Sequence, residues 1–259
     1  MIPKRIDRVV SLAPNLTEIV YAVGAGKSLV GDTSFCDYPP EAKEVTKVGD
    51  TMTPNIETII GLHPQLVLVS TASQLEAFTR QMEQHAIPIY VTDPHDLEGV
   101  FRTIQTLGEI LGEKDKAAQL VGDLRTRASA VEAAVKSSKP TTVFYQVSAK
   151  PLYTAGRDSY ITDVIRRAGG KSVTETVPGA WPKYSDESAL ASQPEAIIMA
   201  SFDSMNKGEP EIADSLKKSP AAKNGRVYGI NGDYLSRPGP RLINGLEEMA
   251  RKLHPEAFK

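Results

Sequence analysis

Two stretches of this chain occur twice, half a chain length apart. Residues 57–70 read ETIIGLHPQLVLVS, and residues 187–200 read ESALASQPEAIIMA. In both, a glutamate is followed seven residues later by a proline and then by an apolar run. Residues 16–29 (LTEIVYAVGAGKSL) and 161–173 (ITDVIRRAGGKSV) match in the same order, apart from a gap. Two matches in the same order indicate an internal duplication, so each half is expected to fold as one copy of the same unit.

Each half alternates apolar runs with segments of helical periodicity, which is typical of a parallel α/β unit. The expected strands are residues 8–13, 28–32, 66–70 and 87–92 in the first half, and 142–147, 196–200 and 226–230 in the second. The expected helices of the second half are residues 159–168, 185–192, 211–217 and 240–253.

Helix starts in the first half are predicted from capping signals. Asn15 and Ser73 each precede a glutamate by three residues, as in a capping box. Thr53 followed by Pro54 reads as an N-cap residue and a first helical residue.

Between the two repeats, apolar residues recur at helical spacing from about residue 96 to 138, with Gly112 as an interruption. A helix over residues 113–136 would be about 36 Å long, too long for a crossover inside one small lobe. The sequence thus predicts an α/β fold of two Rossmann-like lobes with parallel sheets, joined by a long backbone helix. The expected segments are residues 1–112, 113–138 and 139–259. Two successive surface helices of one lobe are the alternative.

Composition excludes several classes of function. The basic residues are scattered and the formal net charge is −2, whereas nucleic-acid binding needs a clustered positive face. The sequence has no run of eighteen apolar residues that could span a membrane. Its one cysteine, Cys36, excludes an internal disulfide. We expect a monomer.

In parallel sheets, ligands bind beyond the carboxyl ends of the strands. The loops expected there carry Pro14, Ser70 and Tyr234. Trp181 lies in a loop framed by glycine and prolines, and it is either a platform for a planar ligand or a core anchor. Asp233 and Arg237 follow the last strand of the second half, where they bind polar ligand groups or pair with each other.

Several segments resemble one known family. They are VSLAPNLTE from Val10, DYPP from Asp37, the stretch from Asn55 to Val67, the Trp181-Pro182 pair and the segment from Arg237 to Arg241. Together they are similar to the solute-binding proteins of ABC importers for cobalamin, haem and siderophores, over nearly the whole chain. The resemblance implies two lobes that close on one ligand with small motions, and delivery of that ligand to a membrane permease and ATPase complex. It also implies a periplasmic or other extracytoplasmic location, with a lipid anchor in the full-length protein as one form of it. No export signal is seen in the sequence, so a cytosolic corrinoid-sensing or scaffold protein is the alternative.

Within the family, the cobalamin-binding members are the most similar. Tyr38, Trp181, Asp233 and Arg237 fall on matching ligand-binding positions. Two aromatic positions of those members are replaced here by Asp50-Thr-Met and by Ser70-Thr. The resemblance therefore implies a corrinoid, cobalamin or cobinamide, as the transported ligand, with no resident cofactor.

The resemblance also implies one acidic docking residue for the permease on each lobe, at Glu76 and Glu187. Both glutamates have a structural explanation as well. Glu76 belongs to the capping box of Ser73, and Glu187 is an acid in the first turn of a helix, where the helix dipole favours it.

Other ligands and functions would need residues of other kinds. Haem would need an axial ligand, for which His95 is the best placed histidine. A siderophore would favour arginines such as Arg157 and Arg237. A hydrolase could in principle use Ser11, His95 and Asp233 as a catalytic triad. No serine of the sequence lies in a nucleophile elbow, however, so we do not expect an enzyme. The four histidines, His63, His85, His95 and His254, do not form a cluster that could hold a metal.

Overall fold

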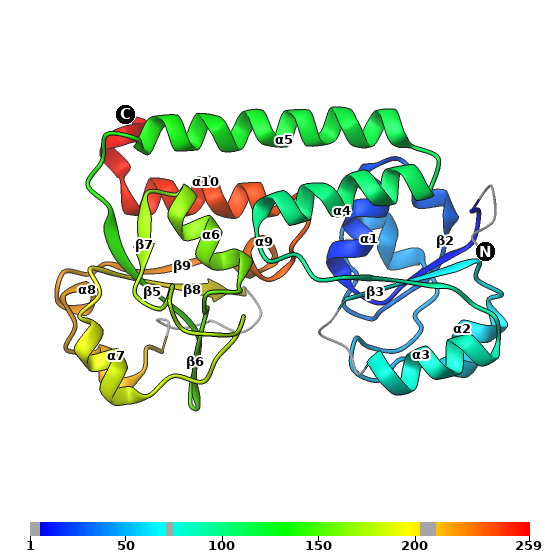
Figure 1. Cartoon of the computed structure of the whole chain (residues 1–259), viewed down its shortest axis with the longest axis horizontal. Helices are drawn as coiled ribbons and strands as arrows, with labels where there is room; N and C mark the ends of the chain where they lie inside the picture. The colour runs from blue at the N-terminus through cyan, green and yellow to red at the C-terminus, as the bar shows by residue number, and fades with distance from the viewer. Residues whose placement is uncertain (1–5, 71–74, 203–210) are drawn as a thin grey trace. The chain divides into compact units, whose positions relative to one another are not determined.

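The computed structural model describes residues 6–70, 75–202 and 211–259, without the side chains of residues 75–77. The chain divides into two units, one formed by residues 1–94 and 98–123 and the other by residues 95–97 and 124–259. Each unit is an α/β layer structure with a sheet between helices (Figure 1).

The sheet of the first unit has four parallel strands in the order β2-β1-β3-β4. These are β1 (Val9–Ser11), β2 (Leu29–Asp32), β3 (Leu66–Ser70) and β4 (Ile89–Thr92). Helices α1 (Pro14–Ala22) and α4 (Leu97–Ile110) lie on one side of this sheet, and α2 (Ile56–Gly61) and α3 (Leu75–Gln84) lie on the other (Figure 1). Two 3-10 turns, Gly26–Ser28 and Pro40–Glu44, belong to the connections.

The sheet of the second unit is built around β5 (Thr141–Ala149), which is paired with β8 (Ala196–Ser201) and through it with β9 (Val227–Asn231). On its other edge, β5 pairs with β7 (Gly170–Ser172) in parallel and with β6 (Leu152–Thr154) antiparallel. Helices α6 (Tyr160–Arg167) and α10 (Leu242–Leu253) lie on one side, and α7 (Asp186–Ser192) and α8 (Pro220–Lys223) lie on the other (Figure 1). The short helix α9 (Gly232–Ser236) follows β9.

The parallel strands have the same order in both units. Across the first sheet the order is β2-β1-β3-β4, and across the second it is β7-β5-β8-β9. In both, the parallel strand that comes second in the chain lies at one edge, followed by the first, the third and the fourth. The sequence matches fall on corresponding elements, on α1 and α6 and on the pairs α2–β3 and α7–β8. Both observations confirm the duplication.

The apolar runs form a separate core in each unit. The α2–α3 side of the first sheet packs around Val10, Val67 and Val69, which are fully or almost fully buried. The corresponding side of the second sheet packs around Phe144 and Ile197. At ~25 cal/mol for each Å² of apolar surface removed from water, these cores are the main source of stability in both units.

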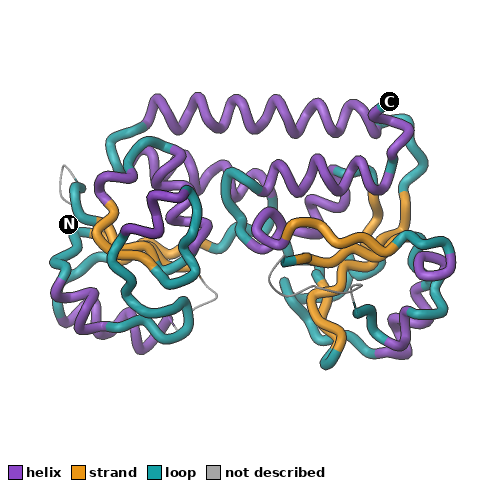
Figure 2. The backbone as a smooth tube through the Cα atoms, turned by 180° about the vertical axis from the view of Figure 1, so that it is seen from behind, coloured by secondary structure: helices purple, strands orange, loops and turns teal. Residues whose placement is uncertain are grey.

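The long helix is α5 (Lys114–Val135), and its 22 residues span about 33 Å. Gly112, at φ +77°, separates it from α4, since a left-handed residue ends a helix. One stripe of α5 is buried at Ala117, Val121, Leu124, Ala128, Val131 and Val135. Figure 2 shows α5 as the longest continuous helix of the chain. No helix in the described ranges is long and apolar enough to cross a membrane.

The fold class is confirmed, with parallel-sheet units and a long helix; the division at residues 112 and 138 stays a prediction. Several local predictions are wrong. Helix α1 has Ala13, not Asn15, at its N-cap, without a side-chain cap. Helix α2 begins two residues after Pro54, because the Asn55 side chain accepts the Thr58 N–H at 3.0 Å. Ser73 lies outside the described residues.

In the second unit, the expected loop after β9 is the helix α9, and the expected helix over residues 211–217 is a 3-10 turn at Asp214–Leu216, in the part of it that is described. The strands β6 and β7 were not predicted, because they are only three residues long and lack a clear apolar alternation. The strand β6 adds one antiparallel edge strand to the otherwise parallel sheet of the second unit.

Candidate ligand-binding site

In the first unit, the strand order reverses direction between β1 and β3, and ligands of open α/β sheets bind beyond the carboxyl ends of the strands at such a point. Pro14 is the first residue of α1, three residues beyond the end of β1, and Ser70 is the last residue of β3. Both are half-buried. The structure therefore brings these two predicted residues to the same edge of the sheet.

The loop that follows β2 exposes two aromatic rings. Tyr38 is 45% exposed and Phe35 is 58% exposed. Between them Cys36 is buried, and its sulfur lies 3.2 Å from the hydroxyls of Thr17 and Thr33. Buried polar contacts thus hold the loop from below while the rings face solvent. Phe35 was not predicted from the sequence, where its one signal is its place three residues before Tyr38, with Cys36 between them.

An ion pair with a buried carboxylate and a partly exposed ammonium fixes the start of this loop. Asp32 ends β2 with no exposed surface, and its Oδ1 accepts from Lys47 Nζ at 2.7 Å. The same ammonium donates to the carbonyls of Cys36 and Ala42. Burial raises the pKa of Asp32 to about 6, although Lys47 acts in the opposite direction. Within the described residues, Asp32 Oδ2 is buried without a hydrogen-bond partner, so the carboxylate is held at an electrostatic cost.

In the second unit, Trp181 is 42% exposed and packs edge-on against Tyr160, with ring centroids 5.6 Å apart. Tyr160 is buried, and its hydroxyl donates to Leu235 O in α9 at 2.9 Å. Burial raises the pKa of Tyr160, so the hydroxyl stays protonated. One side of the Trp181 ring is therefore anchored while the rest is accessible, which combines the two roles considered from the sequence.

Backbone hydrogen bonds hold the loop that carries Trp181. Gly156 N donates to Ala180 O at 3.0 Å, and Arg157 N donates to Val177 O at 2.7 Å. A Cβ at Gly156 would lie 2.3 Å from Gly179 O, so only glycine permits this close approach of the two segments. The tryptophan therefore projects from a preformed loop.

Helix α9 carries the predicted residues Asp233 and Tyr234, and Arg237 is the residue that follows it. Asp233 forms ion pairs with Arg237 at 3.0 Å and with Arg241 at 3.7 Å. Pairing between Asp233 and Arg237 was one of the two alternatives predicted from the sequence. The Arg241 guanidinium also lies over the Tyr234 ring, 5.6 Å from its centroid. Because Tyr160 contacts both Trp181 and α9, the structure brings these residues to one region. Their assignment to ligand binding stays a prediction.

The two docking glutamates do not occupy corresponding positions. Glu187 is exposed in the first turn of α7, and Glu57 holds the matching position in α2. Glu76 lies in α3, and its side chain is outside the described residues. The permease-docking role of Glu76 and Glu187 stays a prediction.

The residues considered for other chemistries have partners of their own. His95 Nδ1 is 2.7 Å from Asp158 O, and the Ser11 hydroxyl, fully buried, donates to Ala13 O. Among the residues that the structure describes, no three His, Cys, Asp or Glu side chains are grouped to hold a metal ion.

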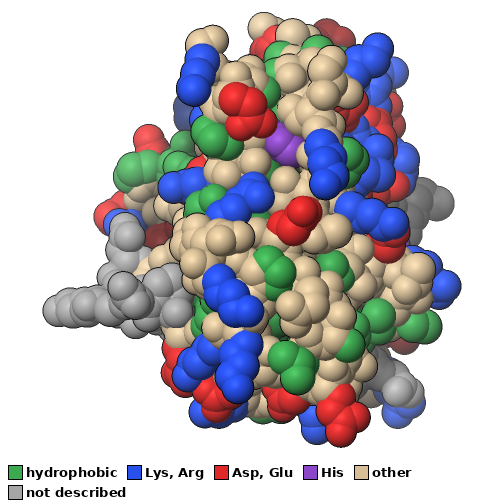
Figure 3. Space-filling view, turned by 90° about the vertical axis from the view of Figure 1, so that its left-hand side faces the viewer, with side chains coloured by type: hydrophobic (Ala, Val, Ile, Leu, Met, Phe, Trp, Pro, Cys, Tyr) green, Lys and Arg blue, Asp and Glu red, His purple; other side chains and the backbone are tan. Residues whose placement is uncertain are grey.

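A polar pocket of about 450 Å³ lies at the opposite, amino edge of the sheet in the second unit. Its lining includes Lys139, Arg226 and Lys252 but also Glu195 and Glu256. Arg226 Nη2 already donates to Leu253 O at 3.0 Å. Figure 3 likewise shows basic and acidic side chains interspersed on one face. The lining of this pocket carries both positive and negative charges and so favours no ligand of one charge. The carboxyl edges of the two sheets therefore remain the candidate site.

A sequence model described as periplasmic binding protein matches residues 9–234. The chain belongs to the periplasmic binding protein family. It is 33% identical to the ABC transporter substrate-binding lipoprotein YvrC of Bacillus subtilis, over the whole chain and 83% of that protein. It is 30% identical to the vitamin B12-binding protein of Vibrio parahaemolyticus, over 98% of the chain and 91% of that protein.

Solved structures of the periplasmic binding protein family are also similar. The vitamin B12-binding protein BtuF of Vibrio cholerae superposes with a TM-score of 0.85 and 28% identity, covering 99% of this chain and all of that one. The haem-binding protein RhuT of Roseiflexus has a TM-score of 0.83 and 25% identity, covering 97% of this chain and 99% of that one.

Proposed function

We propose that this chain captures a corrinoid, cobalamin or cobinamide, and delivers it to the membrane permease and ATPase complex of an ABC importer. The observation that carries the proposal is the 30% identity to a vitamin B12-binding protein over 98% of the chain. Exposed aromatic rings at both carboxyl-edge regions, Phe35 and Tyr38 in one unit and Trp181 in the other, support it. Large apolar rings suit the wide, flat faces of a macrocycle.

The corrinoid is the transported ligand in this proposal, which includes no resident cofactor, metal ion or catalytic residue. Pro14, Ser70, Tyr234, Asp233 and Arg237 are proposed to complete the contacts. Asp233 and Arg237 already form an ion pair, so they can offer a fixed donor and acceptor to polar groups of the ligand. A preorganised pair loses little freedom when the ligand binds.

Titration of the purified chain with cyanocobalamin, haemin and a ferric siderophore tests the ligand. Tryptophan emission reports on Trp181 alone, since it is the one tryptophan of the sequence. We expect saturable quenching by cyanocobalamin and none by the siderophore. Saturable binding of haemin without any corrinoid binding would favour the second candidate, a haem carrier, which the similarity to the Roseiflexus protein supports.

We also propose that the chain acts outside the cytoplasm as a monomer and docks on the permease through Glu76 and Glu187, with no nucleic acid as a partner. Its similarity to a substrate-binding lipoprotein supports the location. The double variant Glu76→Ala with Glu187→Ala should keep its corrinoid affinity and lose transport in a reconstituted importer. Glu57→Ala, at the position that matches Glu187, is the control and should transport normally.

A further inference from the structure

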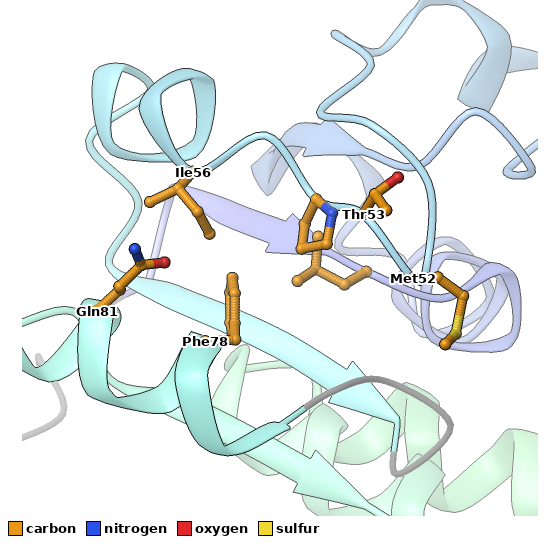
Figure 4. A pocket seen from close by; sticks show the side chains of 7 residues that line it. Met52, Thr53, Ile56, Phe78 and Gln81 are labelled. Atoms are coloured by element: carbon orange, nitrogen blue, oxygen red, sulfur yellow. The ribbon is translucent and has the colours of Figure 1, made fainter.

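The first unit has a pocket of its own at the carboxyl edge of its sheet. It has a volume of about 220 Å³ and opens between the end of β1 and helices α2 and α3. Its lining residues are Leu12, Met52, Thr53, Pro54, Ile56, Phe78 and Gln81. Figure 4 shows the Phe78 ring and the Ile56 side chain projecting from the two helices toward this space, with Gln81 and Met52 on opposite sides. Leu12 is two residues from Pro14, so the pocket adjoins the candidate site.

The rim of the pocket is held in place by a turn. The Asp50 carboxylate accepts the backbone N–H groups of Met52 at 2.7 Å and of Thr53 at 2.6 Å. Gly49 adopts φ +98°, and a Cβ there would lie 2.5 Å from Thr53 O, so the turn requires glycine. Met52 is 54% exposed on this fixed turn. Backbone hydrogen bonds and a close approach at Gly49 therefore fix this rim of the pocket.

The size of the pocket indicates a part of a ligand and not a whole one. Pockets for complete small molecules have about 300–1,000 Å³. An apolar protein cavity of about 150 Å³ is known to take benzene, so a volume about one and a half times larger suits a group of two fused rings.

The lining also indicates the chemistry of the occupant. No charged side chain is among the seven lining residues, all of which the structure describes. A carboxylate placed there would lose its hydration without a counter-charge, so acidic substituents such as propionates are disfavoured. Leu12 and Phe78 are buried apolar surfaces. At the rim, the Thr53 side chain already hydrogen-bonds the Asp50 carboxylate, so the lining offers its occupant mainly apolar contact.

We propose that this pocket binds an uncharged two-ring aromatic base appended to the ligand. The inference rests on the proposed corrinoid function and names the member of that class: a corrinoid that carries a nucleotide base, as cobalamin does, in preference to cobinamide, which lacks one. The pocket adds apolar contact for the base, which cobinamide cannot use because it lacks one.

The test measures the affinities of cyanocobalamin and dicyanocobinamide for the wild-type chain and three variants by isothermal titration calorimetry. The wild type should bind cyanocobalamin about tenfold or more tightly than dicyanocobinamide, because cyanocobalamin buries the apolar area of one additional ring system. Gln81→Trp fills the mouth of the pocket from an exposed position. It should weaken the binding of cyanocobalamin alone, so that its affinity approaches that of dicyanocobinamide. Met52→Ala, which removes part of the wall, should act in the same direction. Gln84→Trp, on the same helix but outside the pocket, should behave as the wild type.

Thermal unfolding of each variant confirms that it is folded. Equal affinity of the wild type for both corrinoids would overturn the pocket assignment and leave the proposed function in place. An equal loss of both affinities in Gln81→Trp would also overturn it. If neither corrinoid binds the wild type, the proposed function itself fails, and the inference with it.

Discussion

At the scale of single residues, the pKa of Asp32 predicts how the stability of the folded chain depends on pH. Its carboxyl is fully buried, and burial raises the pKa to about 6 in the folded chain, above the ordinary value of an aspartate. The folded state then holds this proton more tightly than the unfolded state. Stability from Asp32 is therefore complete below about pH 4 and declines as the pH rises to about 6.

We expect Asp32→Asn to remove this dependence. The free energy of unfolding of the wild type, relative to Asp32→Asn, should fall by roughly 2–3 kcal/mol between pH 4 and 7. Urea denaturation at a series of pH values measures the difference. Asp50→Asn is the control of opposite sign: the backbone N–H groups of Thr53 and Met52 lower the pKa of Asp50, so its contribution is lost as the pH falls. A difference between wild type and Asp32→Asn that does not change with pH would contradict the assignment.

Individual site residues were the hardest to predict from the sequence. Trp181 was recognisable, because a tryptophan in a loop of glycines and prolines has few strand or helix partners. The Asp233–Arg237 ion pair was one of two alternatives, since spacing alone cannot tell a side chain that binds its neighbour from one that binds a ligand. Phe35 and the pocket at Met52 depend on which side chains the chain packing leaves exposed.

At the scale of elements, the capping residues explain where helices begin and make a second prediction. Asn55→Ala removes the acceptor for the Thr58 N–H and should cost about 1 kcal/mol, measured by urea denaturation. Asn55→Ser keeps an acceptor and should cost only a few tenths of that. Ser185→Ala, at the matching cap of α7, should resemble Asn55→Ala, because the Ser185 hydroxyl accepts the Ser188 N–H at 3.0 Å. Equal stability of Asn55→Ala and the wild type would contradict the capping role.

Asp163, in α6, joins three segments of the second unit, which includes Leu97 and the part of α5 from Leu124 onward. It accepts from Arg167 Nε at 2.8 Å and from the N–H of Leu97, the first residue of α4, at 3.1 Å. Arg167 also pairs with Glu132 in α5. Burial acts to raise the pKa of Asp163, but the hydrogen bonds from Arg167, Leu97 and Arg166 outweigh it and lower the pKa. The network therefore stabilises the fold at neutral pH and weakens in acid.

Asp163→Ala should destabilise the chain by about 3 kcal/mol, because it leaves a largely buried guanidinium and a helix-start N–H without their acceptor. The exposed Asp123→Ala on α5 is the matched control and should change stability by less than about 0.5 kcal/mol. Urea denaturation gives both values. Similar stabilities for the two variants would show that the network contributes nothing.

Elements with strong patterns were predictable. The strand at 66–70 was expected with the bounds observed for β3, and α5 was expected to within one residue at either end, because long periodic runs leave few alternatives. Helix starts failed where two signals competed. Thr53 and Pro54 are residue types typical of a helix start. However, the Thr53 N–H donates to the Asp50 carboxylate in a turn, and Asn55 is the N-cap of the helix instead.

At the scale of the whole molecule, ligand binding should appear as added stability. A ligand present at about 100 times its dissociation constant adds ~2.7 kcal/mol to the free energy of unfolding. For a chain of 259 residues this corresponds to a rise in melting temperature of about 5–10 °C. Calorimetry with cyanocobalamin should show this rise, and an equal concentration of a ferric siderophore should leave the melting temperature unchanged. No rise with cyanocobalamin would contradict corrinoid capture.

The overall organisation was the most predictable level, since the repeat in the sequence already required two copies of one topology. The shared strand order confirms it. The sequence could not reveal which residues belong to which unit at the connections, where His95–Leu97 groups with the second unit although both neighbouring segments group with the first.

The buried stripe of α5 has a consequence for anyone who wishes to produce one repeat alone. Ala117 and Val121 belong to the first unit, whereas Leu124 and the stripe residues after it belong to the second. A cut at either end of α5 gives one fragment a helix with an uncovered apolar face and leaves the other with a gap in its core. Both fragments would be prone to self-association. Separate expression of the halves therefore calls for a redesigned α5, with polar residues on the part of the stripe that loses its unit.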